Sequence, residues 1–291
     1  MISIWIRLLG IFFFSAVFVT SSFAWTIKMS FDDGPVGAFA NQDQGYNGFN
    51  GAGRATVFTD EISADGTQSC KMSWPKGHNG WAVCYGRITF SDNPGARSLK
   101  EGDELWVRAY YYFKSPWDWY VPGGPHNKIL RVHTKHADGG NGGYISFLSN
   151  SRGQIIGDSE VGPRPKNYRT NYHYALDRWQ CLEMYIKFST KEPILRMWVD
   201  GKLIIEDTNK NTLKYPSTIA DGSFIATAWA GGAPQDQVQY VDAFVFTTDK
   251  PSKRDADGNP MIGPIDIITG GNKSVNSGGS GCYISSLNLN P

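Results

Sequence analysis

One short stretch of the sequence alternates aliphatic side chains with groups that could do acid–base chemistry. Residues 126–134 read HNKILRVHT, and Lys135 and His136 follow them. Successive side chains of a β-strand point to opposite faces. The stretch therefore predicts two faces, one of Lys128, Leu130 and Val132 and the other of Ile129, Arg131, His133 and Lys135. A strand face that carries an arginine and a histidine fits one wall of a groove that binds an anion.

Two further stretches carry polar groups in the same alternating way. Residues 104–113 read ELWVRAYYYF and residues 178–188 read RWQCLEMYIKF, and each has one largely aliphatic face. The groups on their other faces include Arg108, Tyr110, Tyr185 and Lys187. We expect residues 104–113 beside residues 126–135 in one sheet, and we expect the polar faces of all three strands to line a common groove.

These residue types suit β-elimination from a polysaccharide that contains uronic acid. The reaction removes the proton next to the sugar carboxylate and expels the 4-linked oxygen. An arginine stabilises the carboxylate as it becomes enolate-like, and a histidine or a tyrosine of lowered pKa removes the proton. A tyrosine can protonate the leaving oxygen. Glycoside hydrolysis needs two carboxylates across the scissile bond, and the polar strand faces supply Glu183 without a paired acid nearby.

Composition narrows the partners further. The net charge of the 291 residues is +1, so no overall field favours nucleic acid or an acidic membrane surface. Aromatic residues make up 14% of the chain, which also has 33 glycines. This mixture favours an all-β chain with many turns and with flat surfaces that can stack on sugars.

The first residues resemble an export signal. An apolar run over residues 8–19 is followed by Ser22-Phe23-Ala24, with small residues at the positions that a signal peptidase reads. We expect residues 1–24 to be removed, leaving a secreted protein, extracellular or periplasmic, with no membrane span. Export permits disulfides. Cys70 and Cys84 flank a turn-rich segment, which predicts a bridged hairpin, while Cys181 either pairs with Cys282 or is a buried thiol.

The rest of the pattern predicts one β domain over residues 25–250. Short strands alternate with glycine-rich turns, and the sequence has no convincing amphipathic helix in this range. The expected fold is all-β, a two-sheet antiparallel β-sandwich whose concave groove is the binding site. Residues 153–174 are expected to be a long loop over that groove. Residues 251–291 are expected to form a flexible tail rich in Gly, Ser and Asn, and the protein is expected to be a monomer.

A structural calcium ion is the one metal that the sequence suggests. Asp32, Asp33 and Asp242 would meet if the first and last strands of the sandwich were neighbours, and carboxylate oxygens are the ligands that calcium prefers. The other interpretation is that all three are ordinary turn residues. The sequence contains no zinc-ligand spacing, phosphate-binding loop or Gly-x-Ser-x-Gly motif.

Over residues 25–250 the chain resembles the concanavalin A-like jelly-roll polysaccharide lyases, the group that includes alginate, glucuronan and heparin lyases. The resemblance rests on LKEGDELWVRAYYYF, KILRVHT, RWQCLEMYIKF followed by WVDGKLI, and YVDAFVFTTDKP. In alginate-lyase-like members an Arg strand, an Ile-His strand and a Tyr-x-Lys strand line the groove in that order. This chain departs from the pattern where Arg131 replaces a usual Gln and where Phe188-Ser189-Thr190 replaces an expected Gly-x-Tyr.

The resemblance implies a carbon–oxygen lyase that acts on an acidic polysaccharide and needs no cofactor for catalysis. It implies His133 as the base, Tyr185 as the acid and Arg108 with Arg131 as the carboxylate clamp. The implied subsite residues are Lys187, Tyr110, Lys128 and Trp229. Two alternatives stay open, a non-catalytic carbohydrate-binding or lectin-like module of the same fold and a surface protein whose sandwich holds the tail.

Overall fold

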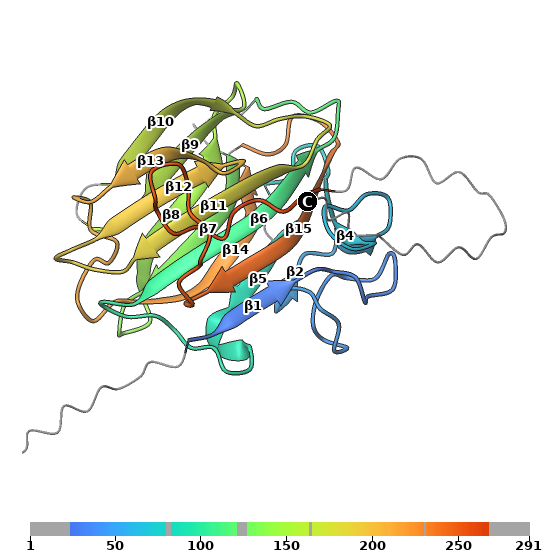
Figure 1. Ribbon diagram of the computed structural model, residues 1–291. Helices are drawn as coiled ribbons and strands as arrows, with labels where there is room; N and C mark the ends of the chain where they lie inside the picture. Colours follow the sequence, from blue (N-terminus) through green and yellow to red (C-terminus); the bar gives the residue numbers. More distant parts are fainter. Residues whose placement is uncertain (1–23, 80–82, 121–126, 163–164, 230, 268–291) are drawn as a thin grey trace, which may run out of the picture.

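The protein is a sandwich of two antiparallel β-sheets that are not closed into a barrel, as the sequence predicted (Figure 1). The computed structural model describes residues 24–79, 83–120, 127–162, 165–229 and 231–267. The predicted signal peptide, apart from Ala24, and the end of the predicted tail lie outside these residues. Within them, helix is confined to one short 3-10 turn, η1 (Phe90–Asp92), and no helix is long and apolar enough to cross a membrane.

One sheet, which we call the β6 sheet, is built around the strand predicted at residues 104–113. Its strands run in the order β13 (Lys202–Asp207), β12 (Ile194–Val199), β11 (Gln180–Lys187), β6 (Glu104–Phe113), β15 (Gln237–Thr247), β4 (Ser69–Trp74) and β3 (Thr56–Thr59), and β1 (Thr26–Met29) also pairs with β15.

The second sheet, which we call the β7 sheet, contains the basic strand. Its order is β10 (Lys166–His173), β9 (Gln154–Ser159), β8 (Asn141–Ser149), β7 (Asn127–Lys135), β14 (Ile219–Trp229), β5 (Gly86–Thr89) and β2 (Gly51–Ala52). Residues 153–174, predicted as a loop, therefore form β9 and β10. That prediction was wrong because β9 contains a glycine and β10 is a polar edge strand, so neither shows an ordinary apolar alternation.

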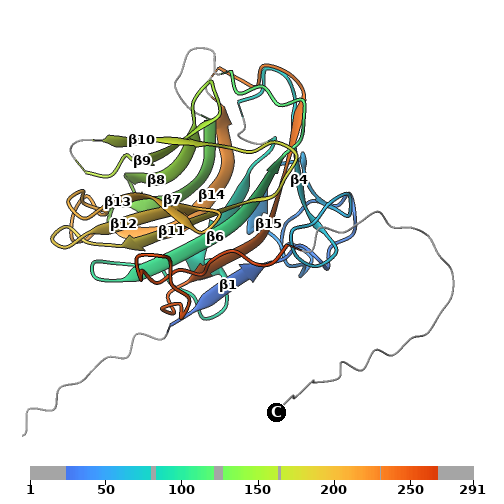
Figure 2. The same ribbon diagram turned by 45° about the horizontal axis from the view of Figure 1, so that its top comes forward.

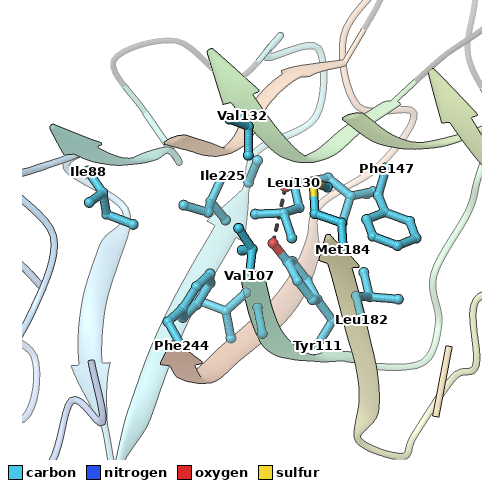
Figure 3. Packing of buried hydrophobic residues seen from close by; sticks show 14 of the residues in the cluster. Ile88, Val107, Tyr111, Leu130, Val132, Phe147, Leu182, Met184, Ile225 and Phe244 are labelled. Carbon is cyan, nitrogen blue, oxygen red and sulfur yellow. Dashed lines mark hydrogen bonds between the residues drawn. The ribbon is translucent and has the colours of Figure 1, made fainter. Parts of the chain in front are cut away.

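The apolar faces of the two sheets meet in a continuous core (Figure 3). Leu130 and Val132 of β7 face Val107 and Tyr111 of β6 across it, and all four side chains are fully buried. The hydroxyl of Tyr111 donates a hydrogen bond of 3.2 Å to the Ile129 carbonyl, which ties one sheet to the other. Burying an aliphatic side chain of this kind stabilises the fold by about 1.5–3 kcal/mol. Since both apolar faces are used here, the two polar faces must point away from each other.

The polar face of the β6 sheet is covered by the chain itself. Residues 251–267, predicted as the start of a flexible tail, instead run along this face, where Figure 1 shows them in red in front of β11 and β6. Trp106 donates from Nε1 to the Pro260 carbonyl at 3.1 Å, and Met261 packs beside it. The view of Figure 2 places this C-terminal segment (residues 251–267) on the side of the β6 sheet away from β7 and β14.

A buried arginine and a buried glutamate hold the C-terminal segment. Arg108 and Glu183 are direct partners across β6 and β11, and both are almost fully buried. The carboxylate of Glu183 accepts hydrogen bonds from the backbone N–H groups of Ile262 and Gly263. Arg108 donates to the carbonyls of Gly263, at 3.1 Å, and Ala243. Burial raises the pKa of Glu183 to about 7, against the opposing effect of these hydrogen bonds and of Arg108.

The predicted disulfide between Cys70 and Cys84 is wrong. Cys70 lies on β4 in the β6 sheet, whereas Cys84 leads into β5 in the other sheet. Since β4 and β5 belong to different sheets, they are not the two arms of one hairpin. Cys70, Cys84 and Cys181 are buried free thiols, and Cys282 lies outside the described residues.

Replacing Glu183 by alanine tests how the C-terminal segment is held. Glu183→Ala leaves the Arg108 cation buried without its opposing charge and leaves two N–H groups without an acceptor. We expect a loss of about 3 kcal/mol in the free energy of unfolding, measured by urea denaturation, and faster amide exchange at Ile262 and Gly263. The matched control is Glu192→Ala, which removes an exposed partner of Lys187 and should change stability by less than about 1 kcal/mol. Equal effects of the two variants would contradict this account.

Candidate functional site

The structure divides the predicted site residues between opposite faces of the molecule. His133 and Arg131 point outward from the β7 sheet. The predicted partners on the β6 sheet, which are Arg108, Tyr110, Tyr185 and Lys187, point outward on the other side. The expected groove shared by all three strands is therefore wrong. The alternation of side chains within each strand was predicted correctly. Alternation does not show which sheet a strand joins, and β6 and β7 belong to different sheets.

The residues of the β6 sheet have structural surroundings. The ring of Tyr185 lies 4.7 Å from that of Trp106 and is buried, and the hydroxyl of Tyr110 accepts a hydrogen bond from the Ile265 backbone. Lys187 forms an ion pair of 3.0 Å with the exposed Glu192. Arg108 is occupied by the C-terminal segment. Arg108, Tyr110 and Tyr185 are buried, and Lys187 alone of the four is partly exposed.

Trp229, predicted to line a subsite, belongs to the core. Its side chain is fully buried against Trp74 and Trp117, and its Nε1 donates to the Tyr120 carbonyl at 3.0 Å. The inward position of Trp229 follows from an irregularity in β14. The register of this strand shifts between Ile225 and Ala228, which turns Trp229 toward the core.

The three aspartates predicted as calcium ligands accept hydrogen bonds from backbone N–H groups, and Asp32 and Asp242 share the loop at residues 64–68 as their donor. Asp32 accepts from Thr67 and Gln68, and Asp33 accepts from Asn47. Asp242 is buried and accepts from Ala64, Asp65 and Ala243. Among the residues that the structure describes, no group of three or more His, Cys, Asp or Glu side chains is placed to hold a metal ion. The alternative interpretation, turn residues, fits Asp32 and Asp33, which lie in the loop after β1, whereas Asp242 lies on β15.

The outer face of the β7 sheet carries a cleft of about 300 Å³ around His133. Strands β5, β14, β7 and β8 supply most of its walls. Its polar and aromatic lining residues are Arg87, Thr89, His133, Lys135, Asn141, Tyr144, Asp221 and Phe224. This cleft is where the predicted base lies, and it is the strongest candidate for a functional site.

A β-bulge positions the acidic partner of His133. Gly222 pairs with both His133 on β7 and Thr89 on β5, whereas the register of β14 shifts between Ala220 and Gly222 and leaves Asp221 unpaired. The bulge turns the Asp221 carboxylate toward the imidazole, with Oδ1 2.6 Å from Nδ1. A Cβ atom at residue 222 would lie 2.2 Å from the Ile88 carbonyl, so only glycine fits there. Because a carboxylate only accepts, Nδ1 carries the proton and Nε2 has the free lone pair.

Tyr144 is the phenol of this cleft, although it was not among the predicted site residues. Tyr144 is the direct cross-strand partner of His133, and the two ring centroids are 4.9 Å apart. Counting residues around the turn at 136–140 could have found it, because that turn joins β7 to β8 as a hairpin. Burial raises the pKa of Tyr144, so the phenol is protonated at neutral pH. A protonated phenol beside an imidazole with a free nitrogen supplies an acid and a base in one cleft.

Arg131 supports Tyr144 and is not open to a ligand. Its guanidinium carbon lies 3.3 Å from the centre of the Tyr144 ring, and its side chain is 3% exposed. Glu160 is 3.6 Å from Arg131 and 3.9 Å from Lys128. A register shift between Lys128 and Leu130 places Lys128 on the same face as Arg131, opposite to the face predicted for it. The open cations of the cleft are instead Arg87 and Lys135, from β5 and β7.

A buried aspartate lies near Arg131, Lys128 and Glu160. Asp158 on β9 is 4% exposed. Burial and then the charge of Glu160 raise its pKa to about 6, although Arg131 and Lys128 act in the opposite direction.

Comparisons with known proteins support the predicted fold. No protein-family model and no curated sequence matches the chain. Solved structures with the same fold include the alginate lyase Aly36B (TM-score 0.55, 13% identity, 76% of this chain and 96% of that one). They also include an endo-β-1,4-glucuronan lyase from the fungus Trichoderma reesei (TM-score 0.52, 10% identity, 67% and 90%). A third is the PL-14 alginate lyase from Aplysia kurodai (TM-score 0.55, 11% identity, 76% and 97%). The predicted resemblance to jelly-roll polysaccharide lyases is thus confirmed for the fold.

The raised pKa of Asp158 predicts a stability effect that depends on pH. The unfolded acid titrates near 3.8 and the folded one near 6, so stability falls as the pH rises between these values and the full cost is present above pH 6. Asp158→Asn should therefore raise the free energy of unfolding by up to about 3 kcal/mol at pH 8 and by little at pH 3. Denaturant titrations at both pH values measure this, with Asp138→Asn, an exposed turn acid, as control. A pH-independent difference between Asp158→Asn and the native protein would contradict it.

Proposed function

We propose that the protein is an exported polysaccharide lyase that cleaves an acidic, uronate-containing polysaccharide by β-elimination in the cleft around His133. The observation that carries the proposal is the contact of His133, Asp221 and Tyr144, with an ordered imidazole beside a protonated phenol. The fold shared with alginate and glucuronan lyases supports it. The apolar run over residues 8–19 supports export.

The proposed reaction assigns one role to each group of the cleft. Nε2 of His133 takes the proton from the carbon next to the sugar carboxylate, and the electron pair of that C–H bond forms the new carbon–carbon double bond. The 4-linked oxygen leaves with its bonding electrons and takes the proton of Tyr144. Asp221 keeps the imidazole in the required tautomer and stabilises the cation that forms. Atoms and charge balance without a cofactor, because the abstracted and donated protons are exchanged with solvent after release of the products.

Arg87 and Lys135 provide the charge that the reaction needs. The substrate carboxylate gains negative charge as the proton leaves, and cations placed beside it stabilise that state. These roles replace those that the sequence assigned to Arg108 and Arg131. Hydrolysis is disfavoured because Asp221 is the one acid among the described lining residues and is bound to His133, whereas a glycosidase needs two carboxylates across the bond.

The test is the ultraviolet absorbance of the unsaturated uronate product on alginate, glucuronan and heparin-type glycans. We expect turnover on at least one of them, and we expect His133→Ala and Tyr144→Phe each to lower kcat at least about 100-fold. Tyr185→Phe, which changes the phenol of the opposite sheet, is the matched control and should keep full activity.

Two results would overturn the proposal. The first is a loss of activity in Tyr185→Phe while His133→Ala remains active. The second is the absence of product on every glycan together with binding that His133→Ala retains, which would favour the carbohydrate-binding module.

A further inference from the structure

A second cleft lies on the same outer face, toward the edge of the β7 sheet. Its volume is about 490 Å³, and it is formed by the turn between β8 and β9 and by the outward side chains of β9 and β10. Ile156 forms an apolar floor, and Arg152 and Arg169 are on its walls. We propose that these two arginines form a binding subsite for a carboxylate of the polysaccharide chain, several sugar units away from the bond that is cleaved. This inference rests on the proposed function for the identity of its ligand.

The turn that carries Arg152 is held by its own side chains. Oδ1 of Asn150 accepts hydrogen bonds from the backbone N–H groups of Arg152, at 2.9 Å, and of Gln154, at 3.1 Å. The amide of Asn150 donates to Gln154 at 2.8 Å. The position of the Arg152 backbone is therefore fixed before any ligand binds, which lowers the entropic cost of binding.

Arg169 reaches the same cleft from the neighbouring strand. It pairs with Ile156 across β9 and β10, so its side chain stands beside the apolar floor. The register of β10 shifts after Arg169, between this residue and His173. Two guanidinium groups on either side of an apolar floor suit a sugar ring that carries a carboxylate, because the fork of an arginine matches a carboxylate.

The charges of the cleft are not balanced within the protein. Arg97, Arg178 and Arg196 each form an ion pair with an acid. Arg152 and Arg169 are exposed, and no carboxylate among the described residues lies within ion-pair distance of either. In a chain of net charge +1, such a pair creates a local positive potential that attracts an anionic polymer.

The position of this subsite relative to His133 suits a long ligand. β10 lies three strand spacings from β7. Along the strands, Tyr144 lies beside Glu160, which is four residues from Ile156 in the sequence. With standard strand dimensions the path is roughly 19 Å. A polymer would cross the strands obliquely, from Arg87 past His133 to Arg169. A short oligosaccharide bound at His133 would not reach the subsite.

The test compares long and short substrates with Arg152→Gln/Arg169→Gln. We expect KM for the polymer to rise about tenfold with kcat unchanged, and KM for the shortest cleavable oligosaccharide to stay the same. The matched control is Arg54→Gln, another exposed arginine without a carboxylate partner among the described residues. Binding of the polymer is also measured by calorimetry in the His133→Ala background, where turnover does not contribute.

The outcomes separate this inference from the proposed function. Turnover by the native protein with an unchanged polymer KM in the double variant would overturn the subsite and leave the lyase standing. Absence of turnover, together with weaker polymer binding in the double variant, would support the subsite and remove the lyase. Charged residues on an edge strand also prevent sheets from pairing. If that is their role, the double variant would self-associate in size-exclusion chromatography while polymer affinity stays the same, which would overturn the subsite.

Discussion

The constraint on which the whole structure depends is that each sheet has one apolar face and that these two faces bury each other. Leu130 and Val132 meet Val107 and Tyr111 in the core, so every polar side chain that alternates with them is directed away from the partner sheet. A two-sheet sandwich therefore has two separate polar faces. In this chain one of them is closed by the C-terminal segment (residues 251–267) and the other carries the cleft. The proposed function is assigned to the polar face of the β7 sheet, which the C-terminal segment does not cover.

The fold was predictable where a strand has a strong period of two. Residues 104–113 were predicted and observed with the same limits, because alternation over ten residues leaves no other interpretation. Residues 153–174 were not recognised as β9 and β10, since Gly157 interrupts one and the other is polar on an edge. Sheet membership was not predictable from alternation at all. Arg108 and His133 have the same local pattern, and only the long-range pairing of their strands separates them.

The site depends on two irregularities that the sequence does not announce. The register shift after Lys128 moves this residue to the face of Arg131, and the bulge at Asp221 brings a carboxylate to His133. A regular strand would have turned the Lys128 side chain into the core. At the bulge, Asp221 has no partner in the ladder and its carboxylate lies 2.6 Å from His133. Tyr144 is a different case, because the hairpin that joins β7 to β8 follows from the glycine-rich turn and places it opposite His133. The position of Tyr144 could be predicted from the glycine-rich turn. The two bulges depend on tertiary packing, which the local sequence does not show.

The cations on the polar face of the β7 sheet are of two kinds. Some hold other side chains of the cleft in place, and others are accessible to a ligand. Arg131 is buried, stacks on Tyr144 and is paired with Glu160, so a ligand carboxylate would have to displace an existing partner to reach it. Exchanging the half-buried Glu160 for a ligand carboxylate gives little net gain, since the cost of desolvating the ligand offsets the attraction. Arg87 and Lys135 line the cleft without this obstacle. Under the proposed function, an anionic sugar would therefore meet the cations at the margin of the cleft, while the buried arginine packs on the phenol beside the imidazole.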